Sequence, residues 1–342
     1  MKKTFVKDIQ DGDSISDVFL VKRKGKGTSR NGAPYLIIQL VDKSGEIEGR
    51  VWEDANQFEK VFENSDFIKA SGKVTQYQGK LQISISNISW VDEKEVDLSD
   101  FLRTSERDPD ELLTELRKIL NSIGDKFLKK LIFAFLDDPQ FIIDFKKTPA
   151  AKGVHHVFMG GLLEHVLSME GLTEKVVSHY KNLDRDILLA GVFFHDIGKV
   201  RELSVKRIFD YTDEGKLIGH LVIGLEMVNE KISKIKDFPD NLALILKHMI
   251  LSHHGTLAFG SPKVPQTLEA LVLSYLDDLD AKINTVETML SEAQDNSWTE
   301  FNKFMDRSFF KPNLKKVEQT QEPQVSKKFS LDHSEMDLFK KS

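Results

Sequence analysis

The run His195-Asp196-Ile197-Gly198-Lys199 decides how the second half of this chain is interpreted. It follows an apolar segment over residues 184–195, which is predicted to be a helix because its apolar residues recur with helical spacing. His195 shares one face of that helix with Leu188 and Val192, so its side chain is expected to point into a core. An imidazole and a carboxylate that together end a buried helix indicate a candidate metal site.

Further helices are predicted near residues 138–147, 160–180, 216–236, 240–254 and 265–292, and the last four of them carry other candidate histidines and aspartates. His165 lies on an apolar stripe with Met169, and Asp277 lies on one with Leu273. A single inward polar residue is normally a hydrogen-bonded core group. Several in one bundle indicate a metal centre instead, because an unpaired buried charge is costly. The candidate ligands are His165, His195, Asp196, His220, His253, His254 and Asp277.

The composition restricts the chemistry of this centre. The 342 residues include no Cys, which excludes thiolate ligands, disulfides and a cysteine nucleophile. Imidazole and carboxylate ligands suit Mn, Fe, Co, Ni or Zn. Asp196 has two oxygens and can bridge two cations, which would lower the pKa of a shared water and neutralise phosphoryl charge. Lys199, one turn further on, is placed to contact a phosphate oxygen; the alternative is a solvated lysine after a helix end.

Residues from about 14 to 92 have the pattern of β-strands instead. Residues 46–52 alternate with period two, and a turn at 77–80 joins the last two strands. The apolar phase of the last strand slips between Ile85 and Ile88, which predicts a β-bulge. A short helix is expected from Asn56 to Phe62. Five strands with a helix between the third and fourth give the order of an OB-fold barrel.

A segment between the first two strands combines cations with nearby aromatic residues and contains no acid. Such a combination suits single-stranded nucleic acid, through phosphate neutralisation and base stacking. The net charge of −6 means that binding depends on this local patch. The alternative is a solvated basic hairpin with core aromatics, especially at Trp52 and Trp90. The predicted nucleic-acid-binding residues are Lys22, Arg23, Lys24, Lys26, Arg30, Tyr35 and Tyr77.

The order of the candidate ligands resembles that of the HD-domain phosphohydrolase superfamily, which is His, His-Asp, His, His, Asp. The extra histidines resemble its two-metal, phosphodiesterase-type branch. The resemblance implies that one metal is held by His165, His195, Asp196 and Asp277. It implies that a second metal is held by Asp196, His220 and one histidine of Ser252-His253-His254-Gly255.

Two of these assignments stay open. His253 is preferred as the ligand of the second metal, with His254 as a further ligand or a substrate contact. Asp277 matches the final aspartate of the pattern, but Asp278 and Asp280 lie close to it in the sequence.

Together with the barrel, the stretch from His155 to His165 closely resembles the YhaM family of 3′→5′ exoribonucleases, over roughly residues 10 to 310. The resemblance implies hydrolysis of single-stranded RNA, and some DNA, from the 3′ end to nucleoside 5′-monophosphates. It implies two divalent cations, with Mn²⁺ preferred over Fe, Co, Ni, Zn or Mg. The expected catalytic residues are Asp196, Lys199 and His156. His155 and His156 either contact the substrate phosphate or leaving group, or stabilise their loop.

We therefore expect a multidomain α+β protein, with a five-stranded OB-like barrel followed by an all-α HD-domain helical bundle. The expected parts are the barrel (1–96), a helical connector (97–150), the HD domain (151–311) and a mostly disordered tail (312–342). The sequence shows no signal peptide or membrane-spanning run, so a cytoplasmic protein is expected. Exposed helical surface could support a homo-oligomer, but no segment specifies one.

Two other functions fit parts of this pattern. One is an HD phosphodiesterase or nucleotidase that acts on a small, for example cyclic, nucleotide, with the barrel serving regulation. The other is a nucleic-acid-binding replication or regulatory factor with minor or vestigial hydrolase activity.

Overall fold

The structure is a computed structural model that describes residues 2–29, 31–102, 104–105, 107–151, 158–205, 209–293 and 297–312, apart from the side chains of Phe259 and Glu292. Of the predicted features, Arg30, His155, His156 and residues 313–342 lie outside the described residues. The chain divides into two compact units, the first ending at Thr288 and the second beginning at Met289.

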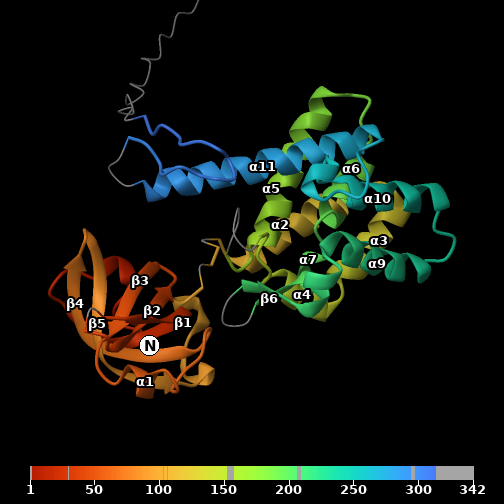
Figure 1. The fold of residues 1–342 in the computed structure, drawn as a ribbon. Helices are drawn as coiled ribbons and strands as arrows, with labels where there is room; N and C mark the ends of the chain where they lie inside the picture. The colour runs from red at the N-terminus through yellow and green to blue at the C-terminus, as the bar shows by residue number, and fades with distance from the viewer. Residues whose placement is uncertain are drawn as a thin grey trace, which may run out of the picture. The chain divides into compact units, whose positions relative to one another are not determined.

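The N-terminal strands form a closed barrel in the order β1-β2-β3-β5-β4 (Figure 1). Its β3 and β5 are parallel, and the other neighbouring pairs are antiparallel. This is the OB-type barrel that the sequence predicts. The short helix α1 (Ala55–Phe58) lies between β3 and β4 in the chain and is shorter than predicted. The strands are β1 (Ser14–Thr28), β2 (Pro34–Asp42), β3 (Gly45–Val51), β4 (Phe67–Tyr77) and β5 (Lys80–Val91).

The predicted bulge is confirmed in β5. Ser71 of β4 pairs with Asn87, whereas the next residue, Gly72, pairs with Ile85, so Ser86 is the extra residue. A Cβ at Gly72 would lie 2.2 Å from the carbonyl oxygen of Ser84, which explains the glycine beside the bulge. After the bulge Ile88 is buried again, in the phase that the sequence predicts.

From residue 109 onward the first unit consists mainly of helices, several of which begin at a capping aspartate. The expectation of an all-α bundle is wrong in one detail, since β6 (Leu203–Val205) and β7 (Phe209–Tyr211) form a two-stranded sheet. Strands of three residues are too short to produce a recognisable period. The helices are α2 (Pro109–Asn121), α3 (Lys126–Leu136), α4 (Pro139–Phe145), α5 (Gly161–His179), α6 (Arg185–Phe194), α7 (Lys199–Glu202), α8 (Asp213–Leu217), α9 (His220–Ser233), α10 (Asp240–Ser252) and α11 (Leu268–Glu292).

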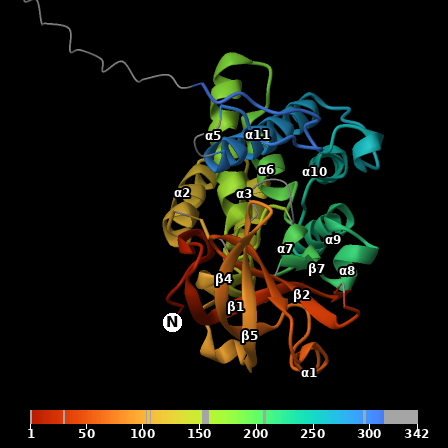
Figure 2. The ribbon, with the colours of Figure 1, turned by 60° about the vertical axis from the view of Figure 1, so that its left-hand side comes forward.

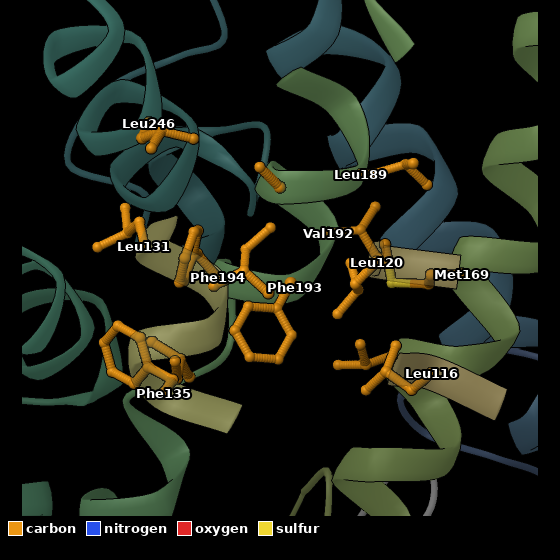
Figure 3. Packing of buried hydrophobic residues seen from close by; sticks show 14 of the residues in the cluster. Leu116, Leu120, Leu131, Phe135, Met169, Leu189, Val192, Phe193, Phe194 and Leu246 are labelled. Carbon is orange, nitrogen blue, oxygen red and sulfur yellow. The ribbon is translucent and has the colours of Figure 1, made fainter. Parts of the chain in front are cut away.

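Helix α6 lies at the centre of this helical core. Every residue from Leu188 to Phe194 is buried, as expected for a helix that is apolar all round. Figure 3 shows Phe193 and Phe194 beside Phe135, whose ring centroid is 5.6 Å from that of Phe194. Because α6 is buried from Leu188 to its end, the residues that follow its last turn begin inside the protein.

Short 3₁₀ helices occur at Val6–Asp8, Glu93–Glu95, Leu98–Asp100 and Leu257–Phe259. In the second unit, isolated antiparallel β-bridges join Trp298 to Phe310 and Asn302 to Arg307. None of the helices in the described part of the chain combines the length and apolarity that a bilayer crossing requires.

Candidate metal centre

The ends of several helices bring all the predicted metal ligands together. His195 and Asp196 directly follow the last residue of α6, and His253 and His254 directly follow that of α10. His220 is the first residue of α9, while His165 and Asp277 lie within α5 and α11. The side chains of His165, His195, Asp196 and His253 are almost completely buried.

One group of candidate ligand atoms lies around His165 and His195. The Nε2 atom of His165 lies 3.3 Å from Nε2 of His195 and 3.2 Å from Oδ1 of Asp277. The Oδ2 atom of Asp196 lies 3.4 Å from Nε2 of His195. We call His165, His195 and Asp277, together with Oδ2 of Asp196, the first ligand group.

A second group faces the other oxygen of the same aspartate. Oδ1 of Asp196 lies 3.4 Å from Nε2 of His220 and 3.5 Å from Nε2 of His253. The Nε2 atoms of His220 and His254 are 3.3 Å apart. We call His220, His253 and His254, together with Oδ1 of Asp196, the second ligand group. Asp196 therefore points one oxygen at each group, as a bridging carboxylate does.

The donor atoms fit divalent cations. Among the described residues, neither Oδ1 of Asp196 nor Nε2 of His253 has a hydrogen-bond partner, although both are buried. Leaving such atoms unpaired is costly, and a cation held by the second ligand group would satisfy both of them. Three sets of side chains each bring three candidate ligand atoms within 4.8 Å of one another, close enough to share an ion. The sets are His165, His195 and Asp277; His195, Asp196 and His253; and His220, His253 and His254.

In each buried histidine, the ring nitrogen that faces away from the centre, Nδ1, is already in a hydrogen bond. His195 and His253 donate from Nδ1 to the carbonyl oxygens of Val192 and Ile250, at 2.7 and 2.9 Å. A carbonyl oxygen can only accept, so Nδ1 carries the proton and the lone pair of the neutral ring lies on Nε2. The Nε2 atoms that face the centre are therefore ready to bind a metal. Burial also lowers the pKa of His253, which favours this neutral form.

Two carboxylates beside His165 favour a positive charge on that ring. Burial alone would lower the pKa of His165, but Asp277 and Asp280 raise it to about 9. Burial likewise raises the pKa of Asp196, but Lys199 and His195 more than offset this and hold it well below its ordinary value. The carboxyl group of Asp196 is thus ionised, which binding a metal would require.

Lys199 lies beside the bridge, with a side chain that is only 11% exposed. Its ammonium donates to Oδ2 of Asp196 at 2.6 Å. The structure therefore places Lys199 against the carboxylate of Asp196, and the predicted contact with a phosphate oxygen stays a prediction.

The structure also places the alternatives to Asp277. Asp278 is half-exposed and pairs with Lys282 on the surface of α11. Asp280 is buried, but it lies behind His165, with Oδ2 at 2.7 Å from Nδ1 of that ring. Asp277 is the aspartate of α11 whose carboxylate faces the first ligand group.

The sequence analysis did not identify Glu202 as part of this centre, and it did not give Asp280 the role of a partner to a histidine. Glu202 contacts His220, and Asp280 was weighed only as an alternative metal ligand. The sequence could have predicted that Asp280 faces the centre, because residues 277 and 280 are three apart and so lie on one face of a helix. For Glu202 no such local signal exists, since the residue that it contacts lies beyond the β6–β7 sheet in the chain.

On the barrel, the predicted basic residues do not form an unopposed patch. Lys22 pairs with Glu46, Lys24 with Glu63 at 2.9 Å and Lys26 with Glu59 at 2.5 Å. The acids come from distant parts of the sequence, so the acid-free composition of the segment does not describe its surroundings. Lys24 is only 15% exposed, and its ammonium also donates to the carbonyl oxygen of Glu59 at 2.9 Å, which is a structural contact. Arg23 is exposed.

A second feature of the barrel is a cluster of aromatic rings around an arginine that the sequence did not single out. The guanidinium carbon of Arg50 lies 5.5 to 5.8 Å from the ring centroids of Tyr35, Trp52 and Tyr77. Tyr35 is stacked on Trp52 with the ring centroids 4.6 Å apart. Trp52 and Tyr77 are 43% and 52% exposed, so neither is a core residue. We call Tyr35, Arg50, Trp52 and Tyr77 the Arg50 cluster.

Comparison with known proteins matches both parts. Residues 162–282 match the HD domain model, and residues 18–91 match the model of an OB-fold nucleic acid binding domain. The chain is 35% identical over 307 residues to the 3′-5′ exoribonuclease YhaM of Bacillus subtilis (strain 168), covering 89% of this chain and 97% of that protein.

Among solved structures, similar chains include the second OB-fold domain of replication protein A from Methanococcus maripaludis. It is 24% identical with a TM-score of 0.23, and the match covers 28% of this chain and 100% of that one. A chain of a replication protein A heterotrimer bound to ssDNA is 22% identical with a TM-score of 0.20, and that match covers 27% of this chain and 66% of that one.

Proposed function

The chain belongs to the YhaM family of 3′–5′ exoribonucleases, and we propose that it removes nucleotides from the 3′ end of single-stranded RNA by hydrolysis at the two ligand groups. The observation that carries the proposal is the position of Asp196, whose two oxygens face separate sets of imidazoles. A two-metal site needs such a bridge. The absence of Cys agrees with hydrolysis that uses no cysteine nucleophile.

In this proposal each ligand group holds one divalent cation. His165, His195, Asp277 and Oδ2 of Asp196 hold the first. His220, His253, His254 and Oδ1 of Asp196 hold the second. When bound, two such ions make a water nucleophilic near neutral pH and neutralise phosphoryl charge. We propose Mn²⁺ as the preferred ion, as the resemblance to the YhaM family implies, and imidazole and carboxylate ligands are compatible with it.

The protein's own part in the reaction is to hold these atoms in place and keep Asp196 ionised. The ammonium of Lys199 lies against Asp196, where burial alone would favour the protonated carboxyl. The same ammonium adds positive charge beside the place where the phosphate would bind. Carbonyl oxygens of Val192 and Ile250 orient the rings of His195 and His253.

The test of this function uses single-stranded RNA labelled at its 5′ end, incubated with the protein and Mn²⁺. We expect a ladder that shortens from the 3′ end, with nucleoside 5′-monophosphates as the released product. Cleavage that starts at internal positions, or that releases the label first, would contradict the proposal. A matched single-stranded DNA tests the extension to DNA, which base stacking and phosphate contacts allow.

We further propose that the Arg50 cluster holds the RNA strand on the barrel. The exposed rings of Trp52 and Tyr77 offer faces on which bases can stack. The guanidinium carbon of Arg50 lies 5.7 and 5.5 Å from their ring centroids, and its Nε pairs with Glu48 at 2.7 Å, so the proposal depends on stacking rather than on an unpaired charge. Tyr35, another predicted nucleic-acid-binding residue, packs against Gly27 and Trp52. Its role in the proposal is to support Trp52.

Replacing Trp52 or Tyr77 by Ala is expected to weaken RNA binding by about 1–3 kcal/mol each, which is about 5- to 150-fold in Kd. The loss follows from the removal of a stacking face. Fluorescence anisotropy with a labelled single-stranded RNA measures it. Trp90→Ala is the matched control, because Trp90 is 47% exposed on the same barrel but has no contact with Arg50 among the described residues. Equal losses in all three variants would argue against the Arg50 cluster.

A further inference from the structure

The two ligand groups share one feature of their outer hydrogen bonds. In each group, one histidine donates from Nδ1 to a backbone carbonyl three residues earlier, namely His195 or His253. In each group, another histidine contacts a buried carboxylate through Nδ1 instead. These are His165, which contacts Asp280, and His220, which contacts Glu202. We call Asp280 and Glu202 the outer carboxylates.

Asp280 holds His165 between two helices. It lies on α11, and its Oδ2 is 2.7 Å from Nδ1 of His165 on α5. Its other oxygen accepts a hydrogen bond from the hydroxyl of Ser168, one turn after His165 on α5. With both oxygens occupied, the carboxylate cannot rotate without losing a contact, so the imidazole is fixed in one orientation.

Glu202 holds His220 in a different way. It ends α7, which lies beside α9 in both views (Figures 1 and 2). Its Oε1 is 3.0 Å from Nδ1 of His220 and 3.0 Å from the backbone nitrogen of the same residue. One oxygen thus fixes both the first turn of α9 and the ring that its first residue carries.

A carboxylate acts on a histidine ligand more strongly than a carbonyl does. It draws the Nδ1 proton toward itself, which increases the electron density on Nε2 and strengthens the bond to a cation. Since each outer carboxylate contacts one group only, its effect should be confined to that group. We propose that Asp280 and Glu202 are positioning residues that set the metal affinities of the first and second ligand groups separately. This inference rests on the proposed two-metal function.

The experiment titrates Mn²⁺ into metal-free full-length protein and follows binding by calorimetry. The wild-type protein is expected to bind two ions. Asp280→Asn should weaken one binding step about 10- to 100-fold and leave the other unchanged, and Glu202→Gln should weaken the other step. Asp277→Asn identifies the step of the first group, which must be the one that Asp280→Asn weakens. The double variant should weaken both steps.

Asp278→Asn is the matched control, because Asp278 lies on the same helix, is half-exposed and pairs with Lys282. It should leave both steps unchanged. Asp280→Glu tests the chemistry, since it keeps a carboxylate and should restore part of the affinity. Circular dichroism of each metal-free variant separates loss of fold from loss of affinity. If Asp280→Asn has unfolded, Ser168→Ala replaces it in the comparison, because it removes a hydrogen bond to Asp280 alone.

The outcomes separate this inference from the proposed function. Wild-type affinity in both variants, or equal weakening of both steps by either one, would overturn the separate roles of the outer carboxylates. Two bound ions without cleavage of RNA would overturn the proposed function and leave the inference intact. A wild-type protein that binds no Mn²⁺ would overturn both.

Discussion

The Asp196→Asn variant is expected to lose at least about 10⁴-fold in the rate of RNA hydrolysis, which corresponds to about 5.5 kcal/mol in the barrier. The reason is that both ligand groups share this one carboxylate, so the change weakens the two groups together. RNA binding should change little, because the Arg50 cluster lies on the barrel. Single-turnover hydrolysis and anisotropy measure the two effects on the same preparations.

Asp278→Asn is again the control, since that carboxylate faces Lys282 rather than the ligand groups. Its rate should equal that of the wild type. If Asp196→Asn kept a tenth of the wild-type rate, the bridging role of Asp196 would be wrong.

The second large effect concerns stability and involves Glu170 on α5. Glu170 is completely buried, and within the described part of the chain neither of its carboxyl oxygens has a hydrogen-bond partner. Burial raises the pKa of this carboxyl well above its ordinary value, and Glu174 raises it further against a smaller opposing effect of Arg185. The folded protein therefore keeps the proton that the unfolded chain releases near the ordinary pKa.

This sets the sign of the pH dependence. Below the ordinary pKa both states are protonated, and the carboxyl has no charge to bury. As pH rises toward the folded pKa, the unfolded state binds fewer protons than the folded state, so stability is lost. The Glu170→Gln variant removes this titration. Its free energy of unfolding should exceed that of the wild type by an amount that grows by up to about 1.4 kcal/mol per pH unit.

Urea unfolding between pH 5 and pH 8 measures this difference. Glu174→Gln is the matched control, because Glu174 lies one turn further along α5, is partly exposed and pairs with Arg185. The difference between that variant and the wild type should not grow in the same way. A constant difference between Glu170→Gln and the wild type across the range would show that Glu170 is ionised in the folded protein at all these pH values.

The fold was largely predictable because its signals are local. Alternation along β2 and β3 gives the barrel, and the phase slip between Ile85 and Ile88 gives the bulge at Ser86. Helical periods give the long helices, whereas the β6–β7 sheet was missed because its strands are three residues long. Each of these features depends on residues close together in the sequence.

The site was predictable where a residue's helical face reveals its direction. Asp277 differs from Asp278 by the face on which it lies, and the structure follows that difference. The partners of these residues come from other elements and left no local signal. The acids that pair with Lys22, Lys24 and Lys26 are examples, since they follow much later in the chain.

The central claim is that Asp196 bridges two cations. Anomalous X-ray diffraction from crystals grown with Mn²⁺, recorded near the manganese absorption edge, tests it most directly. We predict two anomalous peaks about 3.5–4 Å apart, one in the first ligand group beside Oδ2 of Asp196 and one in the second beside Oδ1. A single peak, or two peaks of which neither contacts Asp196, would contradict it.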